Sequence, residues 1–344
     1  MFVKDLRAIS PQLTYENEFL SGDFQVHSDG IMKAIEPSYL DFIPASLLRR
    51  MGKAVRMGIG AGLPLIKQHT DIKGIIIGSA NGGLEDCIRF LNQIVEYEEG
   101  VLTPTNFVNS TPNAVAGVLA VMGEKTGYNS THTNGSLAFD NVLMDAQLYL
   151  ESQPKGTELL IGALEEISDY NYNIDEINGF YKKEIVSNEH LIASSTEGSV
   201  CGEGATMFVV SNEASDALAE IVDQRQICFP DKQELNALVI EFLESNGYSV
   251  QDVDAVIFGD AGDGRTDHWY NDLRNELFSS ASNLTYKQYC GDYRTSNAFA
   301  MYLAIHLLSG QSSIYDIKLK ASPNLILVYN QFSSARHGFV LLRK

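Results

Sequence analysis

Residues 196–210 read TEGSVCGEGATMFVV, and the fold assignment depends on this stretch. The segment GEGA at 202–205 leads directly into the apolar run MFVV, which predicts a buried strand. Glycines at the start of a strand indicate that another part of the backbone approaches closely. The same letters also fit an ordinary tight turn before a strand, so the rest of the chain has to decide between the two interpretations.

Short β-branched apolar runs alternate with longer segments of helical periodicity. The runs predict strands at 72–78, 158–163, 205–210, 255–259, 324–329 and 338–342. The periodic segments predict helices at 44–67, 83–96, 111–125, 135–150, 232–246 and 295–308. Residues 169–197 are polar and rich in tyrosine, and we interpret them as a long aperiodic excursion. The pattern favours an α/β fold with two halves, about 1–215 and 216–344, fused into a single unit of residues 1–344.

Composition and charge exclude several classes of protein. The chain has 344 residues, of which 44% are hydrophobic, so it can bury a large core. Lys and Arg number 25 against 44 Asp and Glu, and a net charge of -19 disfavours nucleic acid and anionic membranes as partners. No stretch approaches the roughly 20 apolar residues that span a bilayer. We therefore expect a cytoplasmic protein without membrane insertion.

The sequence predicts neither a metal nor a cofactor. Its four cysteines lack CxxC or Cys/His ligand spacing, so we expect reduced thiols. They are Cys87, Cys201, Cys228 and Cys290. Asp260, Asp263 and Asp267 do not have the alternating ligands and terminal glutamate of a calcium loop. We interpret that segment as a solvated loop.

Residues 196–210 resemble the R-D-G-F-V-x-G-E-G-A signature of β-ketoacyl synthases, and five further segments resemble motifs of that family in the same order. They are LRRMGKAVRMGIG (48–60), GSANGGLE (78–85), TPTNFVNSTPNAVAGVLA (103–120), STHTNGSLAFDNVLMD (130–145) and the closing strand, turn and strand at 325–342. The resemblance covers nearly the whole chain. It implies the thiolase fold, in which two related halves form a layered α-β-α-β-α architecture.

The same resemblance indicates that the family's catalytic residues are replaced. In the family, a cysteine at the start of a buried helix carries the acyl chain as a thioester, and the match places Thr133 there. The first family histidine falls on Gly259, or on Asp260 after a slip of one residue. The second falls on Asp292, whereas Lys287 matches the family's lysine. A carboxylate cannot stabilise the negative charge that the histidines stabilise, so we expect no condensation at this site.

A changed active site is the alternative to a lost one. Thr133 could form an ester if a strong base activated it, with His132 or His268 as the base and Ser130 nearby. The alternative interpretation is that these are ordinary polar residues near a turn, without a catalytic role. The sequence alone cannot show whether these side chains converge.

Arg49, Lys53 and Arg56 are spaced as one stripe along the predicted helix 44–67, with Arg50 beside them. Such a stripe could dock an acyl carrier protein, whose surface is acidic. The alternative is a solvated helix face with ion pairs inside the chain.

The resemblance extends to chain-length factors of polyketide and aryl polyene pathways, which lack the cysteine and pair with an active ketosynthase. It implies a non-catalytic partner in fatty acid, polyketide or aryl polyene biosynthesis, as a heterodimer or a homodimer. Phe107, Phe139 and Phe332 are candidates for the walls of an acyl tunnel. The alternatives are an acyltransferase or hydrolase with a changed site, and a stand-alone acyl-carrier or lipid-binding module.

Overall fold

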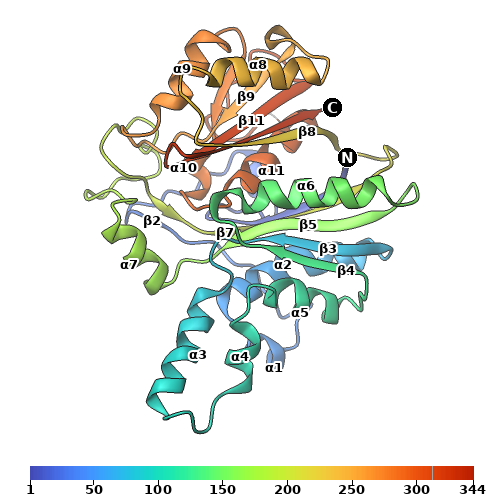
Figure 1. The fold of residues 1–344 in the computed structure, drawn as a ribbon, viewed down its shortest axis with the longest axis vertical. Helices are drawn as coiled ribbons and strands as arrows, with labels where there is room; N and C mark the ends of the chain where they lie inside the picture. The colour runs from blue at the N-terminus through green and yellow to red at the C-terminus, as the bar shows by residue number, and fades with distance from the viewer. Residues whose placement is uncertain (312) are drawn as a thin grey trace.

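The computed structural model describes residues 1–311 and 313–344. Its main feature is a ten-stranded sheet in the order β10-β9-β11-β12-β8-β1-β7-β5-β3-β4 (Figure 1). The N-terminal half supplies β1 (Phe2–Ile9), β3 (Ile72–Gly78), β4 (Tyr128–His132), β5 (Glu158–Glu165) and β7 (Gly204–Ser211). The C-terminal half supplies β8 (Ala219–Cys228), β9 (Ala255–Phe258), β10 (Ser282–Thr285), β11 (Leu325–Phe332) and β12 (Arg336–Arg343).

The two halves repeat one topology. In the N-terminal half β3 pairs in parallel with β4 and β5, and β7 joins β5 and β1 by antiparallel pairing. In the C-terminal half β9 pairs in parallel with β10 and β11, and β12 joins β11 and β8 by antiparallel pairing. The two sets of five strands meet where Phe2 and Val3 of β1 pair with Glu220 and Ala219 of β8. The expected relation between the halves is therefore present.

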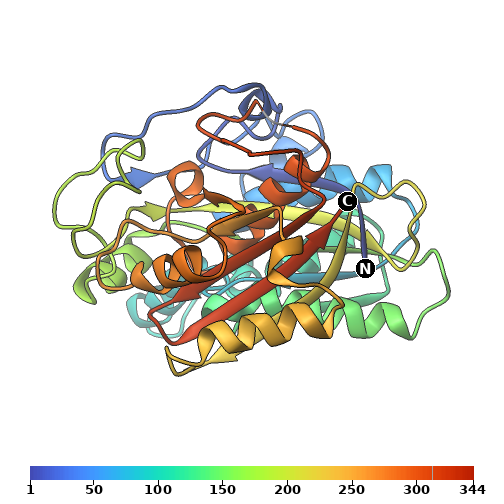
Figure 2. The same ribbon diagram turned by 90° about the horizontal axis from the view of Figure 1, so that it is seen from above.

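Helices fill three layers around these strands, as Figures 1 and 2 show. α6 (Ala138–Glu151) and α11 (Asn297–Leu308) lie in the middle layer, in a core shared by both halves. α2 (Lys53–Gln68) and α5 (Ala114–Met122) cover the outer face of the N-terminal strands. α8 (Leu235–Ser245) and α9 (His268–Glu276) cover the outer face of the C-terminal strands. This arrangement is the α-β-α-β-α layering of the thiolase fold.

The middle layer explains why α11 is apolar on every side. Eleven of its twelve residues are buried, since the helix packs between the two sets of five strands and has no face in water. The central parallel strand β3, IKGIIIG, is a continuous apolar run for the same reason. Three more helices lie outside the layers: α1 (Ala45–Leu48), α3 (Leu84–Glu96) and α4 (Pro104–Asn109). In Figure 1 α3 and α4 extend below the α2 and α5 layer.

All six predicted strands are present, but some expectations were wrong. The predicted helix 44–67 is interrupted, because α1 ends at Leu48 and α2 begins at Lys53. The excursion at 169–197 contains α7 (Asp169–Ile177), whose start is capped by Ser168. Six strands of the described chain were missed: β1, β4, β8 and β10 of the large sheet, and the two-residue strands β2 (Ile31–Met32) and β6 (Cys201–Gly202), which pair with each other.

The GEGA signature marks a close crossing of two backbone segments, as the glycine pattern predicted. Gly202, in the short strand β6 (Cys201–Gly202), lies against the backbone of Cys290 and Gly291. The next residue, Glu203, is fully buried and accepts hydrogen bonds from the backbone N–H groups of Ala34 (2.9 Å) and Ile167 (2.8 Å). The signature therefore joins three distant segments of the chain.

A methyl group at Gly202 should disrupt this crossing. It would overlap the carbonyl oxygen of Cys290 and lie 2.6 Å from Cα of Gly291, and neither backbone atom can turn away. We expect Gly202→Ala to lower the free energy of unfolding by about 3 kcal/mol, as overpacking of a rigid site does. Urea unfolding of the variant and of the unchanged protein measures this difference in the free energy of unfolding. The control is Gly117→Ala in α5, where a new Cβ meets nothing closer than 3.9 Å; equal stability of the two variants would contradict the crossing.

Candidate functional site

A polar cavity of about 380 Å³ opens at the carboxyl ends of the parallel strands β9 and β11. Ligands bind at this edge in open α/β sheets. The loop after β9, the short helix α10 (Lys287–Cys290) and the turn between β11 and β12 form its walls, together with the segment after α7. Lining residues are Asn178, Phe180, Ala261, Asp263, Arg265, Thr266, Lys287, Asp292, Gln331, Phe332, Ser333 and Ser334.

The cavity contains an ion pair between two residues of the predicted site. Lys287 Nζ lies 2.8 Å from Asp292 Oδ1, and Lys287 is only 3% exposed. The backbone holds Asp292 in place, because its N–H donates to the carbonyl of Val200 (2.7 Å) and its carbonyl accepts from Gly202 N–H (3.2 Å). The family signature thus positions Asp292 directly.

Neither of the two residues considered for the position of the first family histidine lines the cavity. Gly259 has no room for a side chain, since a Cβ would overlap Asn330 Oδ1 and lie 2.8 Å from the Tyr270 hydroxyl oxygen. Asp260 is buried, and Arg274 NH2 donates to its Oδ2 at 2.7 Å. The residue that borders the cavity is Ala261. Sequence reasoning missed Ala261, because counting residues cannot locate the bend after β9.

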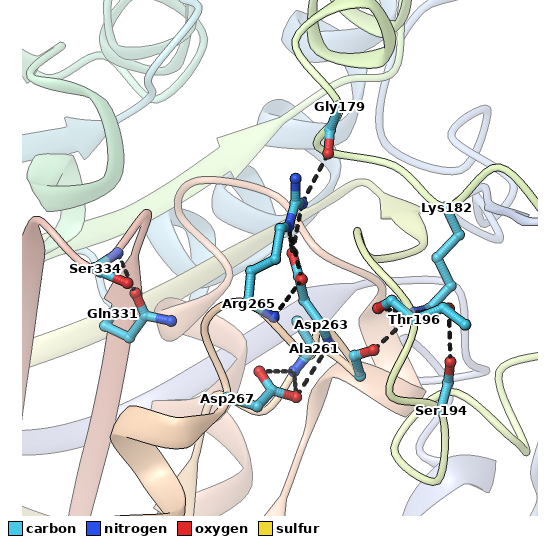
Figure 3. A network of polar contacts seen from close by, with 11 residues as sticks. Gly179, Lys182, Ser194, Thr196, Ala261, Asp263, Arg265, Asp267, Gln331 and Ser334 are labelled. Atoms are coloured by element: carbon cyan, nitrogen blue, oxygen red, sulfur yellow. Dashed lines mark hydrogen bonds and ion pairs between the residues drawn. The ribbon is translucent and has the colours of Figure 1, made fainter.

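Aspartates of the loop at 261–267 organise its backbone, so the interpretation as a solvated loop was wrong. Asp267 accepts hydrogen bonds from the N–H groups of Ala261 (3.1 Å) and Asp263 (3.2 Å), and burial raises its pKa to about 6. Asp263 pairs with Arg265 at 2.6 Å, and Arg265 also donates to the carbonyl of Gly179. Figure 3 shows that these contacts tie the loop to the segment after α7.

Thr133 is exposed and precedes the first turn of α6. The first buried hydroxyl at the start of that helix belongs to Ser136, whose Oγ has no hydrogen-bond partner among the described residues. His132 pairs with Asp145 (2.8 Å) on the edge strand β4, whereas His268 begins α9 in the other half. The structure therefore does not bring the alternative catalytic residues together.

The three tunnel candidates lie in three different environments. Phe107 on α4 is 59% exposed and packs on Phe90, with ring centroids 5.4 Å apart. Phe139 is fully buried in the middle layer beside Phe208. Phe332 lines the polar cavity. Of the three, Phe332 alone borders a cavity found in the described part of the chain.

The four basic residues do not form one helical stripe, because the helix is interrupted between them. Arg49 and Arg50 are exposed in the turn between α1 and α2. Lys53 pairs with Glu203, and Arg56 forms a bidentate pair with Glu36 at 2.6 and 2.7 Å. The sequence spacing could not reveal these partners, since Glu203 and Glu36 are distant in the sequence. A docking role stays a prediction for Arg49 and Arg50.

Among the described residues, no cysteine lines the cavity. The four cysteines are free, and burial raises the pKa of Cys201 to about 12, which keeps its thiol protonated. Within residues 1–311 and 313–344, no group of three or more His, Cys, Asp or Glu side chains could hold a metal ion. In the same residues, no helix is long and apolar enough to cross a membrane.

The ion pair of the cavity can be tested by removing one partner. Asp292→Ala would leave Lys287 charged and almost fully buried, and we expect a loss of about 3 kcal/mol of stability. The double variant Lys287→Met/Asp292→Ala should recover most of the lost stability, because it leaves no unpaired charge buried. Asp71→Ala is the matched control, because its pair with Lys73 is exposed and worth at most about 1 kcal/mol. Urea unfolding that gives equal losses for both single variants would contradict a buried pair.

A buried carboxyl group links α6 to α11. Asp140 is 1% exposed and accepts a hydrogen bond from Asn297 Nδ2 at 2.9 Å. Burial raises its pKa from 3.8 to about 7, so the folded protein holds this proton more tightly than the unfolded chain does. Between these two pH values, this group makes stability fall as the pH rises.

Asp140→Asn should remove that contribution. We expect the thermal unfolding midpoint of the variant to fall less than that of the unchanged protein between pH 4 and about 7, because an amide does not ionise. Differential scanning calorimetry at several pH values measures both slopes. Identical slopes would show that Asp140 does not take up a proton on folding.

Comparison with known proteins agrees with this fold. Residues 25–190 match the family model for the β-ketoacyl synthase N-terminal domain. A search of curated proteins found no significant match. Among solved structures, the ishigamide ketosynthase/chain length factor is 17% identical with a TM-score of 0.78, and it covers 99% of this chain and 98% of its own.

Two further solved structures are similar over comparable lengths. A β-ketoacyl synthase from Burkholderia phymatum is 14% identical with a TM-score of 0.78, covering 100% of this chain and 98% of its own. A ketosynthase (ApeO) in complex with its chain length factor (ApeC), from Xenorhabdus doucetiae, is 13% identical with a TM-score of 0.76. The match covers 99% of this chain and 97% of that structure's chain. Residues 25–190 thus match the β-ketoacyl synthase N-terminal domain, and the chain as a whole has the thiolase-like fold of these solved structures.

Proposed function

We propose that this chain is a non-catalytic partner of an active β-ketoacyl synthase, of the chain-length-factor type, in fatty acid, polyketide or aryl polyene biosynthesis. The observation that carries the proposal is the ion pair of Lys287 and Asp292 in the polar cavity. Among the residues that the structure describes, none that lines this cavity is a cysteine or a histidine. A lining without either residue type supports a site that lacks the family's nucleophile and its two histidines.

The charge at the site opposes the family's chemistry. Decarboxylation of a malonyl group leaves an enolate, and donors aimed at its oxygen stabilise it. Here the buried lysine is neutralised by Asp292, and a carboxylate beside the developing negative charge would raise its energy. A site built in this way favours a binding or structural role over condensation.

An open sheet edge supports pairing with another subunit. β4 ends the ten-stranded sheet, so one side of its backbone has no strand partner in the described chain. Exposed apolar side chains flank it: Tyr128 on β4 is 39% exposed, and Met144 and Leu148 on α6 are 42% and 60% exposed. An unpaired edge bordered by apolar surface is suited to continuing the sheet into a partner.

The protruding helices α3 and α4 add to this surface. Val95 of α3 is 80% exposed and Val101, between the helices, is 92% exposed. Leu91, Phe107 and Val108 are also more than half exposed. Several exposed apolar side chains on one protruding pair of helices are typical of an interaction site. Two of the similar structures are described as a ketosynthase/chain length factor and as a ketosynthase with its chain length factor, which supports a ketosynthase as this chain's partner.

The polar cavity fits the arm of an acyl carrier protein better than an acyl chain. Its walls offer amide groups from Asn178 and Gln331 and hydroxyl groups from Ser333 and Ser334. These groups can hydrogen-bond the amides of a phosphopantetheine arm. A similar structure is described as an acyl carrier protein in complex with its ketosynthase, and we extend that partner to this chain as part of the proposal.

Pairing is tested by co-expression with ketosynthases from the same source. We expect the chain to co-purify with one of them, and Leu148→Lys to abolish co-purification, because a lysine cannot be buried unpaired in an interface. Ile177→Lys is the matched control, since Ile177 is 85% exposed on α7, away from β4. Equal effects of both variants would contradict β4 and α6 as the interface.

The non-catalytic role is tested by intact-protein mass spectrometry with acyl and malonyl carrier proteins. We expect no acyl adduct on this chain alone, and longer products only when it is present with the active ketosynthase. An adduct on Ser136 or Thr133 would sink the proposal and would favour an acyltransferase or hydrolase.

A further inference from the structure

A second polar cavity lies between β10, α10 and the segment 316–318. Its volume is about 220 Å³, and it shares no lining residue with the cavity described above. Lys287 of α10 lines the first cavity, whereas Gln288 and Tyr289 line the second. Because β10 and β4 are the opposite ends of the ten-stranded sheet, the second cavity is separate from the surface proposed for the partner. Its lining residues are Asn283, Leu284, Thr285, Gln288, Tyr289, Asp316, Ile317 and Lys318.

Three contacts hold the segment 315–320 beside β10 and α10. The hydroxyl of Tyr289 donates to the carbonyl of Tyr315 at 2.6 Å, and the N–H of Lys320 donates to Ser282 Oγ at 2.9 Å. The ring of Tyr315 stacks on that of Phe24, with ring centroids 4.4 Å apart. The second cavity is therefore bounded by elements that the fold fixes in place.

Two amide side chains present hydrogen-bond acceptors at this cavity. Asn283 Nδ2 donates to the carbonyls of Phe278 (3.0 Å) and Ala281 (3.3 Å). Gln288 Nε2 donates to the carbonyl of Thr285 (3.1 Å). The oxygen atoms of both amides are buried and find no hydrogen-bond partner among the described residues. Since a buried acceptor without a partner is unfavourable, a ligand that donates to these oxygens supplies the missing hydrogen bonds.

The carboxylate at this cavity is weakly paired. Asp316 is the one acidic residue among the lining residues, and Lys318 Nζ lies 3.4 Å from its Oδ1. The two side chains are 64% and 88% exposed, and an ion pair with this exposure is weak. Another ammonium group can therefore replace Lys318 at Asp316. Together with the two amide oxygens, the carboxylate suits a ligand that is rich in donors and positively charged.

We propose that the second cavity binds a small alkyl diamine. One ammonium group donates to the amide oxygens of Asn283 and Gln288, and the other pairs with Asp316. An ammonium group has three donors and no acceptor, which matches these oxygens. The volume is several times the roughly 30 Å³ that one water occupies in the liquid, so a four-carbon diamine fits. This inference goes beyond the proposed function and does not depend on pairing with a ketosynthase.

The test is isothermal titration calorimetry of the full chain with 1,4-diaminobutane, butylamine and 1,4-butanediol. We expect the diamine to bind more tightly than butylamine by up to about fivefold, which is the worth of one exposed ion pair. Butanediol should give no measurable binding, because it makes no charge-assisted hydrogen bond. Asp316→Asn should abolish the advantage of the diamine over butylamine. Asparagine suits this position, since Asp316 has a φ of 58° and asparagine tolerates the left-handed region.

Gln288→Met is the decisive variant, because it removes one acceptor oxygen and keeps the length of the side chain. We expect the affinity for 1,4-diaminobutane to fall about tenfold or more, since the lost hydrogen bond is made to a charged group. Gln93→Met on α3 is the matched control. The amide oxygen of Gln93 is also buried without a partner in the described chain, but Gln93 does not line this cavity. Thermal unfolding establishes that both variants are folded.

Three outcomes would overturn the inference. One is the absence of binding at millimolar 1,4-diaminobutane. Another is an equal loss of affinity in the folded Gln288→Met and Gln93→Met variants, or no loss in either, because the diamine would then bind elsewhere on this acidic chain. The third is binding of Ca²⁺ by a chain that does not bind the diamine, since the oxygen atoms would then serve a metal ion.

Discussion

The contact between Gly202 and Gly291 is the constraint on which the site depends. Two backbones can approach this closely only where both residues lack a Cβ, and here they join the signature of the N-terminal half to α10 of the C-terminal half. The crossing aligns the carbonyl of Val200 with the N–H of Asp292 at 2.7 Å. Because Asp292 is fixed in this way, its side chain can pair with Lys287 in the cavity.

A second consequence of the crossing is a row of carboxylates that face inward. Glu203 is fully buried beside Gly202, and its hydrogen bonds to two backbone N–H groups and its pair with Lys53 compensate for its burial. Glu165 is buried on the neighbouring strand β5, and burial raises its pKa to about 7. Buried polar groups with specified partners fix the mutual positions of strands more strictly than apolar contacts do. The strand ends beside the crossing are therefore held by directional bonds.

The sequence predicted the fold where burial dominates and failed where pairing partners are distant. Strands such as β3 were predictable because both faces are covered, so that all apolar residues are adjacent in sequence. β4 reads YNSTH, and its polar residues concealed a strand that lies at the sheet edge. The interruption at 49–52 was also hidden, because its residues fit a helical period equally well. Lys287 and Asp292 were found by motif, whereas Ala261 needed the geometry of the bend after β9.

The architecture explains how a condensing site could be lost without loss of the fold. The cavity is formed by loops and short helices at the sheet edge, whereas the large apolar clusters lie between the layers. If Asp292 stands where the family has a histidine, as we propose, Lys287 neutralises its charge. The exposed apolar side chains of β4, α3 and α4 also lie outside the cavity, so a change in the cavity does not alter them. Under the proposed function, this exposed apolar surface is where the active ketosynthase binds, and its position outside the cavity allows pairing whatever chemistry the cavity has.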